Sequence, residues 1–468
     1  MNTIDAETKT TRENARVSAR RGKNMSSTTL PYLVVGLGAS GVSCVQYLKA
    51  QGQTVKVVDT RLAPPGLEQV SQRWPDVEIK LGAFDVDDFI HCREILISPG
   101  VPLAMPAVQQ AIAQGVPCYG DVELFVREAK APIFAVTGSN GKSTTVTLLT
   151  ELLREQGLHV ELGGNIGVPV LDLLKKPVPD YYVLELSSFQ LETTSSLKAH
   201  AAVVLNVSAD HMDRYASLED YRNSKTKIFA DANWAIVNVD DTAIAEASQQ
   251  SKQRVTYSLH SKAVDVGLAQ IKQQTWIKLK NELIIDVSEL KIPGRHNVEN
   301  VLAVLALAST AGLTKAAMIA TLRRFTGLDH RTQWVLEQDQ IRWYNDSKGT
   351  NIGATVAAID GLGCPVVLIA GGQGKGADFN ELSPSVCRHA RAVVLIGEDA
   401  PLIEQALGGC VPVAHAQSMD EAVLKARGYA QAGDAVLLSP ACASFDMFKN
   451  FVDRGDTFVE SVKRLIEQ

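Results

Sequence analysis

The amino-acid sequence predicts an α/β fold of three consecutive domains, and three observations lead to it. From residue 31 onward, short apolar runs alternate with amphipathic stretches, which is typical of parallel sheets with crossover helices. Glycine-rich turns at 36–41 and 138–144 each follow an apolar run and open a helical stretch. The chain has 468 residues, which at roughly 100–200 residues a domain suffices for several. We expect Rossmann-like domains at both ends and a phosphate-loop ATPase-type parallel sheet between them.

The first domain is expected at 30–120, after a polar tail. Residues 1–29 contain six Lys or Arg, three Asp or Glu and almost no large apolar side chain, so we expect a flexible tail. A basic localisation segment is the alternative. A helix is expected at 42–50. Extended segments are predicted at 32–35, 55–59, 94–98 and 115–120.

The second domain is expected at 121–326 and is the largest. Apolar runs predict its strands at 132–136, 181–185, 201–206 and 235–238. A hairpin region is predicted at about 254–292. Helical periodicity predicts helices at 121–129, 297–311 and 315–325.

The third domain is expected at 327–468. Its predicted strands are again short and apolar, and they lie at 341–345, 366–370, 392–396 and 435–438. Loops at 346–351 and 371–376 each follow an apolar strand, which favours ligand loops over plain turns. Cys442, in the loop 439–444, has no local histidine, so we expect a packed residue rather than a nucleophile.

Composition excludes several classes of protein. The chain has 46 Lys or Arg against 52 Asp or Glu, a net charge of −6, so neither nucleic acid nor an anionic membrane is an expected partner. No apolar run approaches the roughly 18 residues that a membrane helix needs, and no signal peptide is expected. The seven cysteines are scattered without a C-x-x-C pair, which predicts neither a disulfide framework nor a zinc site. We therefore expect a cytoplasmic protein, acting as a monomer.

The turn at 36–41 reads G-x-G-x-x-G and is followed 18 residues later by Asp59 at a strand end. Its glycines would let backbone N–H groups approach a diphosphate at a helix N-terminus. A tight turn with no ligand is the alternative. The nucleotide stays open, because Asp59 suits a ribose hydroxyl whereas Thr60 and Arg61 could serve another diphosphate.

The turn at 138–144 reads Gly-Ser-Asn-Gly-Lys-Ser-Thr and predicts a triphosphate loop. Backbone N–H groups would wrap the phosphates, Lys142 would supply a charge, and the hydroxyl of Ser143 or Thr144 could reach Mg²⁺. Val136 stands where the general P-loop pattern has glycine, which weakens a motor or switch GTPase interpretation. A chance match in a helix-capping loop is the alternative.

Polar residues downstream suggest a cation site beside this loop. Glu185 ends one strand, and His211 lies between two carboxylates after another. Strand ends of such sheets carry sites, and Mg²⁺ prefers oxygen ligands, so Glu185 with His211 would suit a second cation. Lys225, judged by spacing alone, is a solvated helix residue.

In this order, the segments resemble the bacterial muramyl ligases from about residue 31 to the C-terminus. The stretches that carry the resemblance are 138–144, 163–167, 184–194, 210–214, 294–297, 330–331, 345–348 and 439–444. The phosphate loop is shared with folylpolyglutamate synthetases and identifies only the chemistry. The stretches 187–192 and 439–444 resemble the branch that adds D-glutamate.

The resemblance implies an ATP-dependent, ADP-forming ligase that adds D-glutamate to UDP-N-acetylmuramoyl-L-alanine through an acyl phosphate, in peptidoglycan precursor synthesis. It implies two Mg²⁺ ions and a CO₂-derived carbamate on Lys225. Alternatives are a ligase for another amino acid, a folylpolyglutamate synthetase, a dinucleotide-dependent dehydrogenase with an ATP module, or a non-enzymatic ATP-gated binding protein.

The resemblance also implies a role for each site residue. Catalysis would rest on Lys142, Glu185, His211 and Lys225, and the metal ions on Ser143, Glu185, His211 and Lys225. ATP would contact Gly138, Ser139, Asn140, Gly141, Lys142, Ser143, Thr144, Asn300, Arg331 and Asp346. The UDP substrate would contact Gly38, Ser40, Asp59, Thr60, Arg61, Asn165 and His211. D-Glutamate would contact Lys348, Thr350, Lys375, Ser444 and Phe451.

Overall fold

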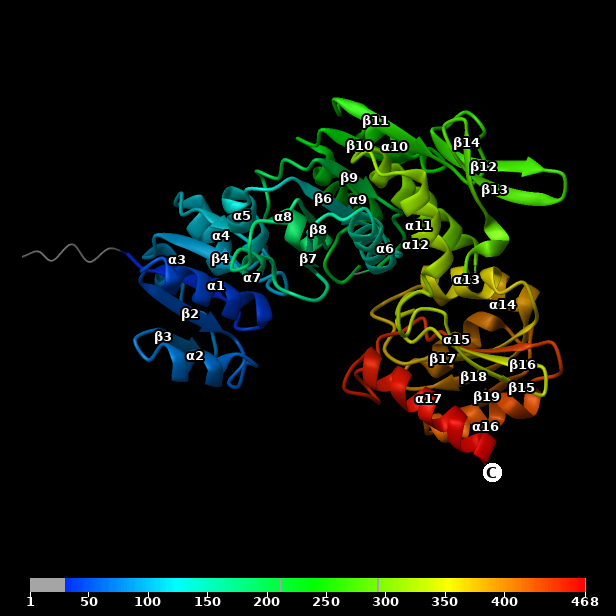
Figure 1. The fold of residues 1–468 in the computed structure, drawn as a ribbon. Helices are drawn as coiled ribbons and strands as arrows, with labels where there is room; N and C mark the ends of the chain where they lie inside the picture. The colour runs from blue at the N-terminus through cyan, green and yellow to red at the C-terminus, as the bar shows by residue number, and fades with distance from the viewer. Residues whose placement is uncertain (1–29, 211, 293, 468) are drawn as a thin grey trace, which may run out of the picture. The chain divides into compact units, whose positions relative to one another are not determined.

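The computed structural model describes residues 30–210, 212–292 and 294–467. The predicted tail at 1–29 lies outside the described residues. The chain divides between Cys118 and Tyr119 into two compact units, whose helices and strands are labelled in Figure 1. Among the described residues, no helix is both long and apolar enough to cross a membrane.

The first unit contains a five-stranded sheet in the order β3-β2-β1-β4-β5. Its strands are β1 (Tyr32–Val35), β2 (Val55–Asp59), β3 (Glu78–Leu81), β4 (Glu94–Ile97) and β5 (Cys118–Tyr119). Strands β1 to β4 pair in parallel. The helices are α1 (Ala39–Ala50), α2 (Leu67–Arg73), α3 (Val86–Ile90) and α4 (Pro106–Ala113). The apolar run of β1 is buried from Leu33 to Val35, as is typical of a strand in a parallel sheet covered on both faces.

The second unit begins with α5 (Asp121–Glu128) and contains a nine-stranded sheet in the order β14-β13-β12-β11-β10-β9-β6-β8-β7. The parallel strands are β6 (Ile133–Thr137), β7 (Val160–Gly164), β8 (Tyr181–Glu185), β9 (Ala201–Val204), β10 (Trp234–Asn238) and β11 (Gln253–Tyr257). An antiparallel extension follows, made of β12 (Val266–Ile271), β13 (Gln274–Leu279) and β14 (Glu282–Asp286). The predicted hairpin region is therefore an antiparallel meander that starts only after β11.

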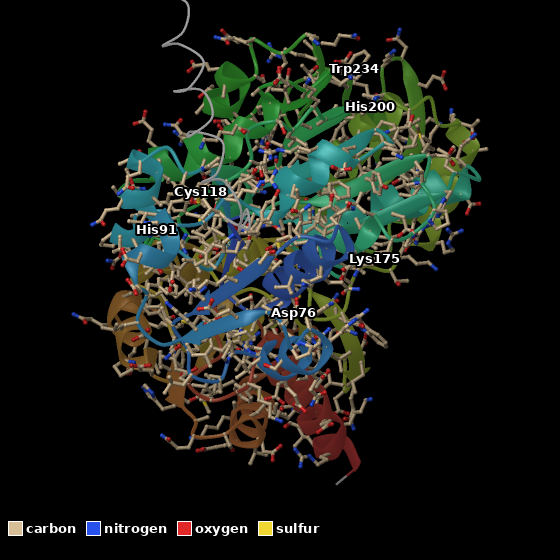
Figure 2. All side chains as sticks on the ribbon, turned by 90° about the vertical axis from the view of Figure 1, so that its left-hand side faces the viewer. Asp76, His91, Cys118, Lys175, His200 and Trp234 are labelled. Atoms are coloured by element: carbon tan, nitrogen blue, oxygen red, sulfur yellow. A yellow bond between two sulfur atoms is a disulfide. The ribbon has the colours of Figure 1, made fainter. Side chains whose placement is uncertain are left out.

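Helices α6 (Lys142–Glu155) and α11 (Arg295–Ser309) share a hydrophobic core with this sheet. Helix α12 (Lys315–Arg324) packs beside α6. His200 lies just before β9 (Figure 2). Its ring is edge-on to Phe134 and Tyr181, and its Nε2 is 3.1 Å from Thr310 Oγ1. His200 is therefore half-buried against these aromatic rings, and desolvation lowers the pKa of its imidazole. Shorter helices in this part are α7 (Val170–Leu173), α8 (Ser188–Glu192), α9 (Leu218–Thr226) and α10 (Thr242–Ala247).

The same unit contains a six-stranded sheet in the order β15-β16-β20-β17-β18-β19. Its strands are β15 (Gln333–Gln338), β16 (Ile341–Asn345), β17 (Val366–Gly371), β18 (Ala390–Ile396), β19 (Val413–His415) and β20 (Ala435–Leu438). All pair in parallel except β15, an antiparallel edge strand. Its helices are α13 (Ile352–Gly361), α14 (Ser383–His389), α15 (Ala400–Leu407), α16 (Met419–Tyr429) and α17 (Phe451–Glu467).

Three α/β sheets confirm the predicted fold class. The domain ranges 30–120, 121–326 and 327–468 stay predictions at the residue level. Strands β3, β7, β15 and β19 were not predicted. None of β3, β15 and β19 has a buried residue, and β7 ends in two glycines, so none of the four is a continuous buried apolar run.

The prediction of no disulfide was wrong. Cys387 in α14 and Cys410 after α15 form a disulfide, with their Cα atoms 5.5 Å apart. The two cysteines are 23 residues apart in sequence and become neighbours because α14 packs beside α15. The spacing of the two cysteines in the sequence does not show that they are close in the folded chain, so it could not predict the disulfide.

Candidate active site

The glycine-rich loop after β6 is held in place by the segment that follows β9. The side chain of Asn206 accepts a hydrogen bond from Asn140 N at 2.9 Å and donates one to Asn140 O at 3.2 Å. Ser139 Oγ donates to Ser208 O at 3.1 Å and accepts from Ser208 N at 3.0 Å. Gly141 has φ +82°, and an added Cβ would lie 2.3 Å from Asn300 Oδ1. Both the backbone angle and the close approach therefore require glycine there.

Lys142 and Ser143 are the first two residues of α6, and their polar atoms contact different groups. Lys142 Nζ donates to the carbonyl oxygens of Gly138 and Ser139, at 2.7 and 2.9 Å. Desolvation lowers the pKa of Lys142, against the opposing charge of Glu185. Ser143 Oγ donates to Glu185 Oε2 at 2.7 Å. A cation and a hydroxyl thus stand side by side at a helix N-terminus, where the helix dipole also favours an anion.

Glu185, at the end of β8, is the carboxylate of this site and is 3% exposed. Its second oxygen accepts a hydrogen bond from Asn165 Nδ2 at 2.8 Å. Ser143 and Glu185 offer a hydroxyl and a carboxylate, the oxygen donors that Mg²⁺ prefers. These residues fit the predicted magnesium site, although no group of three or more His, Cys, Asp or Glu in the described part of the chain could hold a metal. His211, predicted as a ligand, lies outside the described residues.

Lys225, near the end of α9, is 1% exposed, so the interpretation as a solvated helix residue was wrong. Its Nζ donates to Gly138 O at 3.0 Å and lies 4.4 Å from the centroid of the Tyr221 ring. Desolvation, aided by the charge of Lys142, lowers the pKa of Lys225 to about 6. Lys225 is therefore a largely neutral amine directly beneath the phosphate loop.

The loops around the six-stranded sheet contribute a second group of predicted residues. Arg331 Nη2 donates to Ser143 Oγ at 2.6 Å. Asp346 accepts hydrogen bonds from Thr332 N at 2.9 Å and from Ser439 Oγ at 2.7 Å. Burial raises the pKa of Asp346 to about 6. The cavity here is small, about 90 Å³, and its walls include Asn140, Gly141, Thr144, Asn300, Arg331 and Asp346.

A larger cavity of about 410 Å³ adjoins the phosphate loop. Its wall brings together residues predicted for ATP, metal, substrate and D-glutamate: Ser139, Asn140, Gly141, Lys142, Ser143, Asn165, Glu185, Arg331, Lys348, Thr350, Lys375 and Phe451. Lys348 Nζ lies 4.0 Å from the centroid of the Phe451 ring, and burial lowers the pKa of Lys348 to about 8. Ser444 is buried and is not among the described residues that line this cavity.

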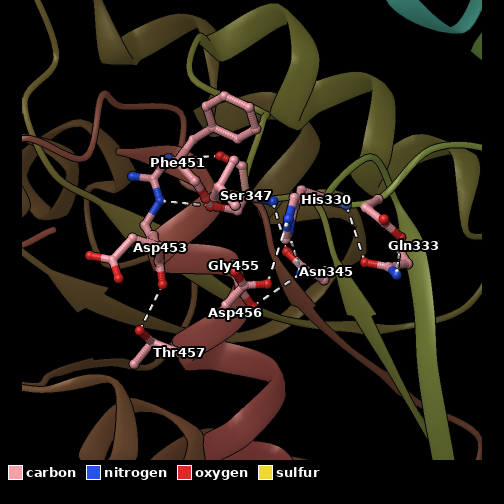
Figure 3. A network of polar contacts seen from close by, with 12 residues as sticks. His330, Gln333, Asn345, Ser347, Phe451, Asp453, Gly455, Asp456 and Thr457 are labelled. Atoms are coloured by element: carbon pink, nitrogen blue, oxygen red, sulfur yellow. Dashed lines mark hydrogen bonds and ion pairs between the residues drawn. The ribbon is translucent and has the colours of Figure 1, made fainter. Parts of the chain in front are cut away.

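Helix α17 supports these loops through a polar network that the sequence analysis missed (Figure 3). Asn345 Nδ2 donates to Gly455 O at 3.1 Å and lies 3.0 Å from His330 Nδ1. Ser347 Oγ donates to Phe451 O at 2.7 Å. Arg454 is fully buried and donates to Ser347 O at 2.7 Å. An arginine in an amphipathic helix gives no sign in the sequence that it will be buried.

In the first unit, the glycine turn is closed by Asp59. Asp59 Oδ2 accepts a hydrogen bond from Leu37 N at 2.7 Å and forms an ion pair with Arg61 Nη2 at 2.6 Å. An added Cβ on Gly41 would lie 1.9 Å from Gly36 O, so close packing alone requires that glycine. Gly38 and Ser40 are half-buried at the start of α1, and Thr60 is exposed. The ligand of this turn stays a prediction.

The fold and the loop together define the class of phosphate-loop α/β proteins. Comparison with known proteins identifies the family. Residues 31–120 match the Mur ligase MurD-like N-terminal domain, residues 136–308 the Mur ligase middle domain, and residues 330–442 the Mur ligase glutamate ligase domain. The chain belongs to the Mur ligase family.

Close relatives share one name, UDP-N-acetylmuramoylalanine–D-glutamate ligase. The protein of Nitrosococcus oceani is 47% identical over 93% of this chain and 96% of its own length. That of Pseudomonas syringae is 49% identical over 92% of this chain and 98% of its own. That of Coxiella burnetii is 47% identical over 94% of this chain and all of its own.

Solved structures agree on the fold. The pseudomurein peptide ligase type C of Methanothermus fervidus has a TM-score of 0.61 at 17% identity, covering 93% of this chain and 100% of that one. The MurF ligase of Thermotoga maritima, solved in complex with ADP, has a TM-score of 0.60 at 15% identity, covering 95% of this chain and 97% of that one. At such low identity these likenesses concern the fold alone.

Proposed function

We propose that this protein is an ATP-dependent ligase that joins D-glutamate to UDP-N-acetylmuramoyl-L-alanine, in peptidoglycan precursor synthesis. The name that the relatives share supports this choice of substrates. The main structural support for the proposal is the charge of the larger cavity. Its walls include four basic side chains and two acidic ones, namely Lys142, Arg331, Lys348 and Lys375 against Glu185 and Asp210.

A ligase of this type must bring anions together, because its ATP, its acceptor carboxylate and the carboxylates of D-glutamate all carry negative charge. Lys142 would face the outer phosphates of ATP from the N-terminus of α6. Lys348 and Lys375 line the same cavity, where they would hold the carboxylates of the amino acid. A net positive cavity offsets the mutual repulsion of these reactants.

The proposed reaction has two steps. The acceptor carboxylate oxygen attacks the γ-phosphorus and ADP leaves, which forms an acyl phosphate. The amine of D-glutamate then attacks the activated carbonyl, phosphate leaves, and the nitrogen loses a proton to give an amide. Arg331, which reaches Ser143 from a loop beside the six-stranded sheet, would help to hold the transferred phosphoryl group.

Ser143 and Glu185 would hold one Mg²⁺, and Glu185, His211 and the carbamate of Lys225 a second. When bound, Mg²⁺ neutralises charge on the phosphoryl oxygens. The carbamate needs a neutral amine, and burial of Lys225 supports this. The nucleotide site would also include Asn300 and Asp346, and the UDP group would lie on Gly38, Ser40, Asp59, Thr60 and Arg61. We further propose that the enzyme works in the cytoplasm as a monomer.

The test is phosphate release with UDP-N-acetylmuramoyl-L-alanine, ATP and either D- or L-glutamate. We expect release with D-glutamate only. Lys142→Ala should lose at least about a hundredfold in rate, since one electrostatic donor is removed from the transition state. The exposed Lys130, changed to alanine, is the matched control and should retain activity. Turnover of Lys142→Ala at the wild-type rate would remove the loop from the mechanism.

A further inference from the structure

Asn351 is a buried polar residue of the predicted ligand loop 346–351 for which no individual role was predicted, and it directly precedes α13. It is 8% exposed and directly follows Thr350. Its Oδ1 accepts a hydrogen bond from Ala354 N at 2.9 Å, so it caps the N-terminus of α13. A cap uses only the oxygen of the side-chain amide, which leaves the NH₂ group for another partner.

The amide of Asn351 pairs with the amide of Asn140 in the phosphate loop. Asn351 Nδ2 donates to Asn140 Oδ1 at 3.2 Å, and Asn140 Nδ2 donates back to Asn351 Oδ1 at 3.4 Å. Asn351 Nδ2 also lies 3.4 Å from Asp210 Oδ2, in the segment after β9. One side chain therefore joins a loop of the six-stranded sheet to two loops of the nine-stranded sheet.

The partner of Asn351 is tied to the segment after β9. Asn206 accepts a hydrogen bond from Asn140 N and donates one to Asn140 O, so Asn351 reaches a residue that is already joined to the nine-stranded sheet. A second close approach lies two residues further on, within the first turn of α13, where an added Cβ on Gly353 would lie 3.0 Å from Ser208 Oγ. Close approach at Gly353 and the amide pair at Asn351 place the first turn of α13 directly against the phosphate loop.

We propose that Asn351 is a positioning residue that docks the loop 346–350 onto the phosphate loop, so that Lys348 and Thr350 line the same cavity as Lys142. Its effect on turnover rests on the proposed ligase function. Asn351 itself acts through the loop it holds, because its amide is already used by Asn140, Asp210 and the backbone of α13. The competing role is that of a helix cap alone.

Two substitutions separate these roles. Asn351→Ser keeps a good N-cap residue and removes the amide that reaches Asn140. Asn351→Asp also keeps the cap, but it loses the NH₂ donor and places a carboxylate beside Asp210. Ser418→Ala is the control for loss of a cap elsewhere, since Ser418 caps α16 by accepting from Glu421 N at 3.3 Å.

The experiment measures kinetics of each variant together with hydrogen exchange of the amides in 138–144, without substrates. We expect kcat/KM for D-glutamate to fall about ten- to a hundredfold in Asn351→Ser, and further in Asn351→Asp, as two or three hydrogen bonds are lost. Amides of the phosphate loop should exchange faster in both. Ser418→Ala should keep wild-type kinetics and wild-type exchange in 138–144.

Wild-type kcat/KM and wild-type exchange in both variants would overturn the proposal. If the wild-type protein makes no amide at all, the ligase function fails, and the exchange data still decide whether Asn351 docks the loop. If Asn351→Ser does not fold, Asn351→Asp carries the test, and unfolding of both variants would reduce Asn351 to a structural residue and overturn the positioning role.

Discussion

The buried amine of Lys225 gives a prediction that can be worked through in numbers. With its pKa lowered from 10.5 to about 6, about nine tenths of this side chain is neutral at pH 7. A lysine of ordinary pKa is neutral in only roughly 3 molecules in 10,000 at the same pH. Burial therefore raises the amount of the CO₂-reactive form about 3000-fold.

The direction of the pH effect follows from the same shift. A lysine whose pKa is lowered is neutral above that pKa and becomes charged as the pH falls through it, so the amine of Lys225 is available above about pH 6 and lost below. Carbamate formation also releases a proton, which favours the carbamate further at high pH.

Nuclear magnetic resonance of protein labelled with ¹³C at lysine Cε tests this directly. In CO₂-free buffer, the resonance that disappears in Lys225→Arg should titrate near pH 6. Addition of ¹³C-bicarbonate at pH 7 should give a carbamate signal in the wild type and in Lys227→Arg, which removes an exposed lysine two positions away. Titration of Lys225 near its ordinary pKa, or a carbamate signal that survives in Lys225→Arg, would refute the reasoning.

Two more predictions concern local geometry. Gly141→Ala combines a left-handed φ with a clash against Asn300, whereas Gly157→Ala has φ +88° and no atom within 4 Å. Backbone strain should lower the free energy of unfolding of each variant by about 1–3 kcal/mol, as measured by chemical denaturation. Gly141→Ala should be destabilised more than Gly157→Ala and should bind ATP more weakly. Equal destabilisation of both variants with unchanged ATP affinity would contradict the clash. Cys387→Ser removes the bond to Cys410, which closes a loop of 23 residues, so denaturation of oxidised protein should show a loss of about 3 kcal/mol that vanishes under reducing agent. Two free thiols at these positions in oxidised protein, by mass spectrometry, would refute the pairing.

The fold class was predictable because its signals are local. Apolar runs such as 32–35 and 366–370 are buried on both faces of parallel sheets, so they stand out without knowledge of their neighbours. Glycine turns that join such a run to a helix were equally visible. Strand β15 was missed because it lies at a sheet edge and half of its residues face solvent, so it lacks a continuous apolar run.

The site was predictable only where a motif marks it. Lys142 and Ser143 belong to a loop whose spacing is imposed by phosphate geometry. Lys225 has no such mark, because α9 is largely polar and its burial arises from packing beneath a loop that lies 87 residues earlier. Arg454 and Asn351 are similar cases, since their partners lie 107 and 211 residues away and no local pattern distinguishes them.

The cations of the site show a conflict between stability and binding. Burial lowers the pKa of Lys142, Lys348 and Arg331 alike, so each of them is destabilised as a cation in the free protein. Lys142 partly offsets this cost with carbonyl oxygens of its own loop, and Arg331 with the hydroxyl of Ser143. Neither partner carries a full negative charge. A polyanion that enters the cavity would therefore meet cations still lacking full compensation, and the interaction would be stronger than at a solvated surface. Part of the free energy that burial of these cations costs the folded chain would be recovered when an anion binds beside them.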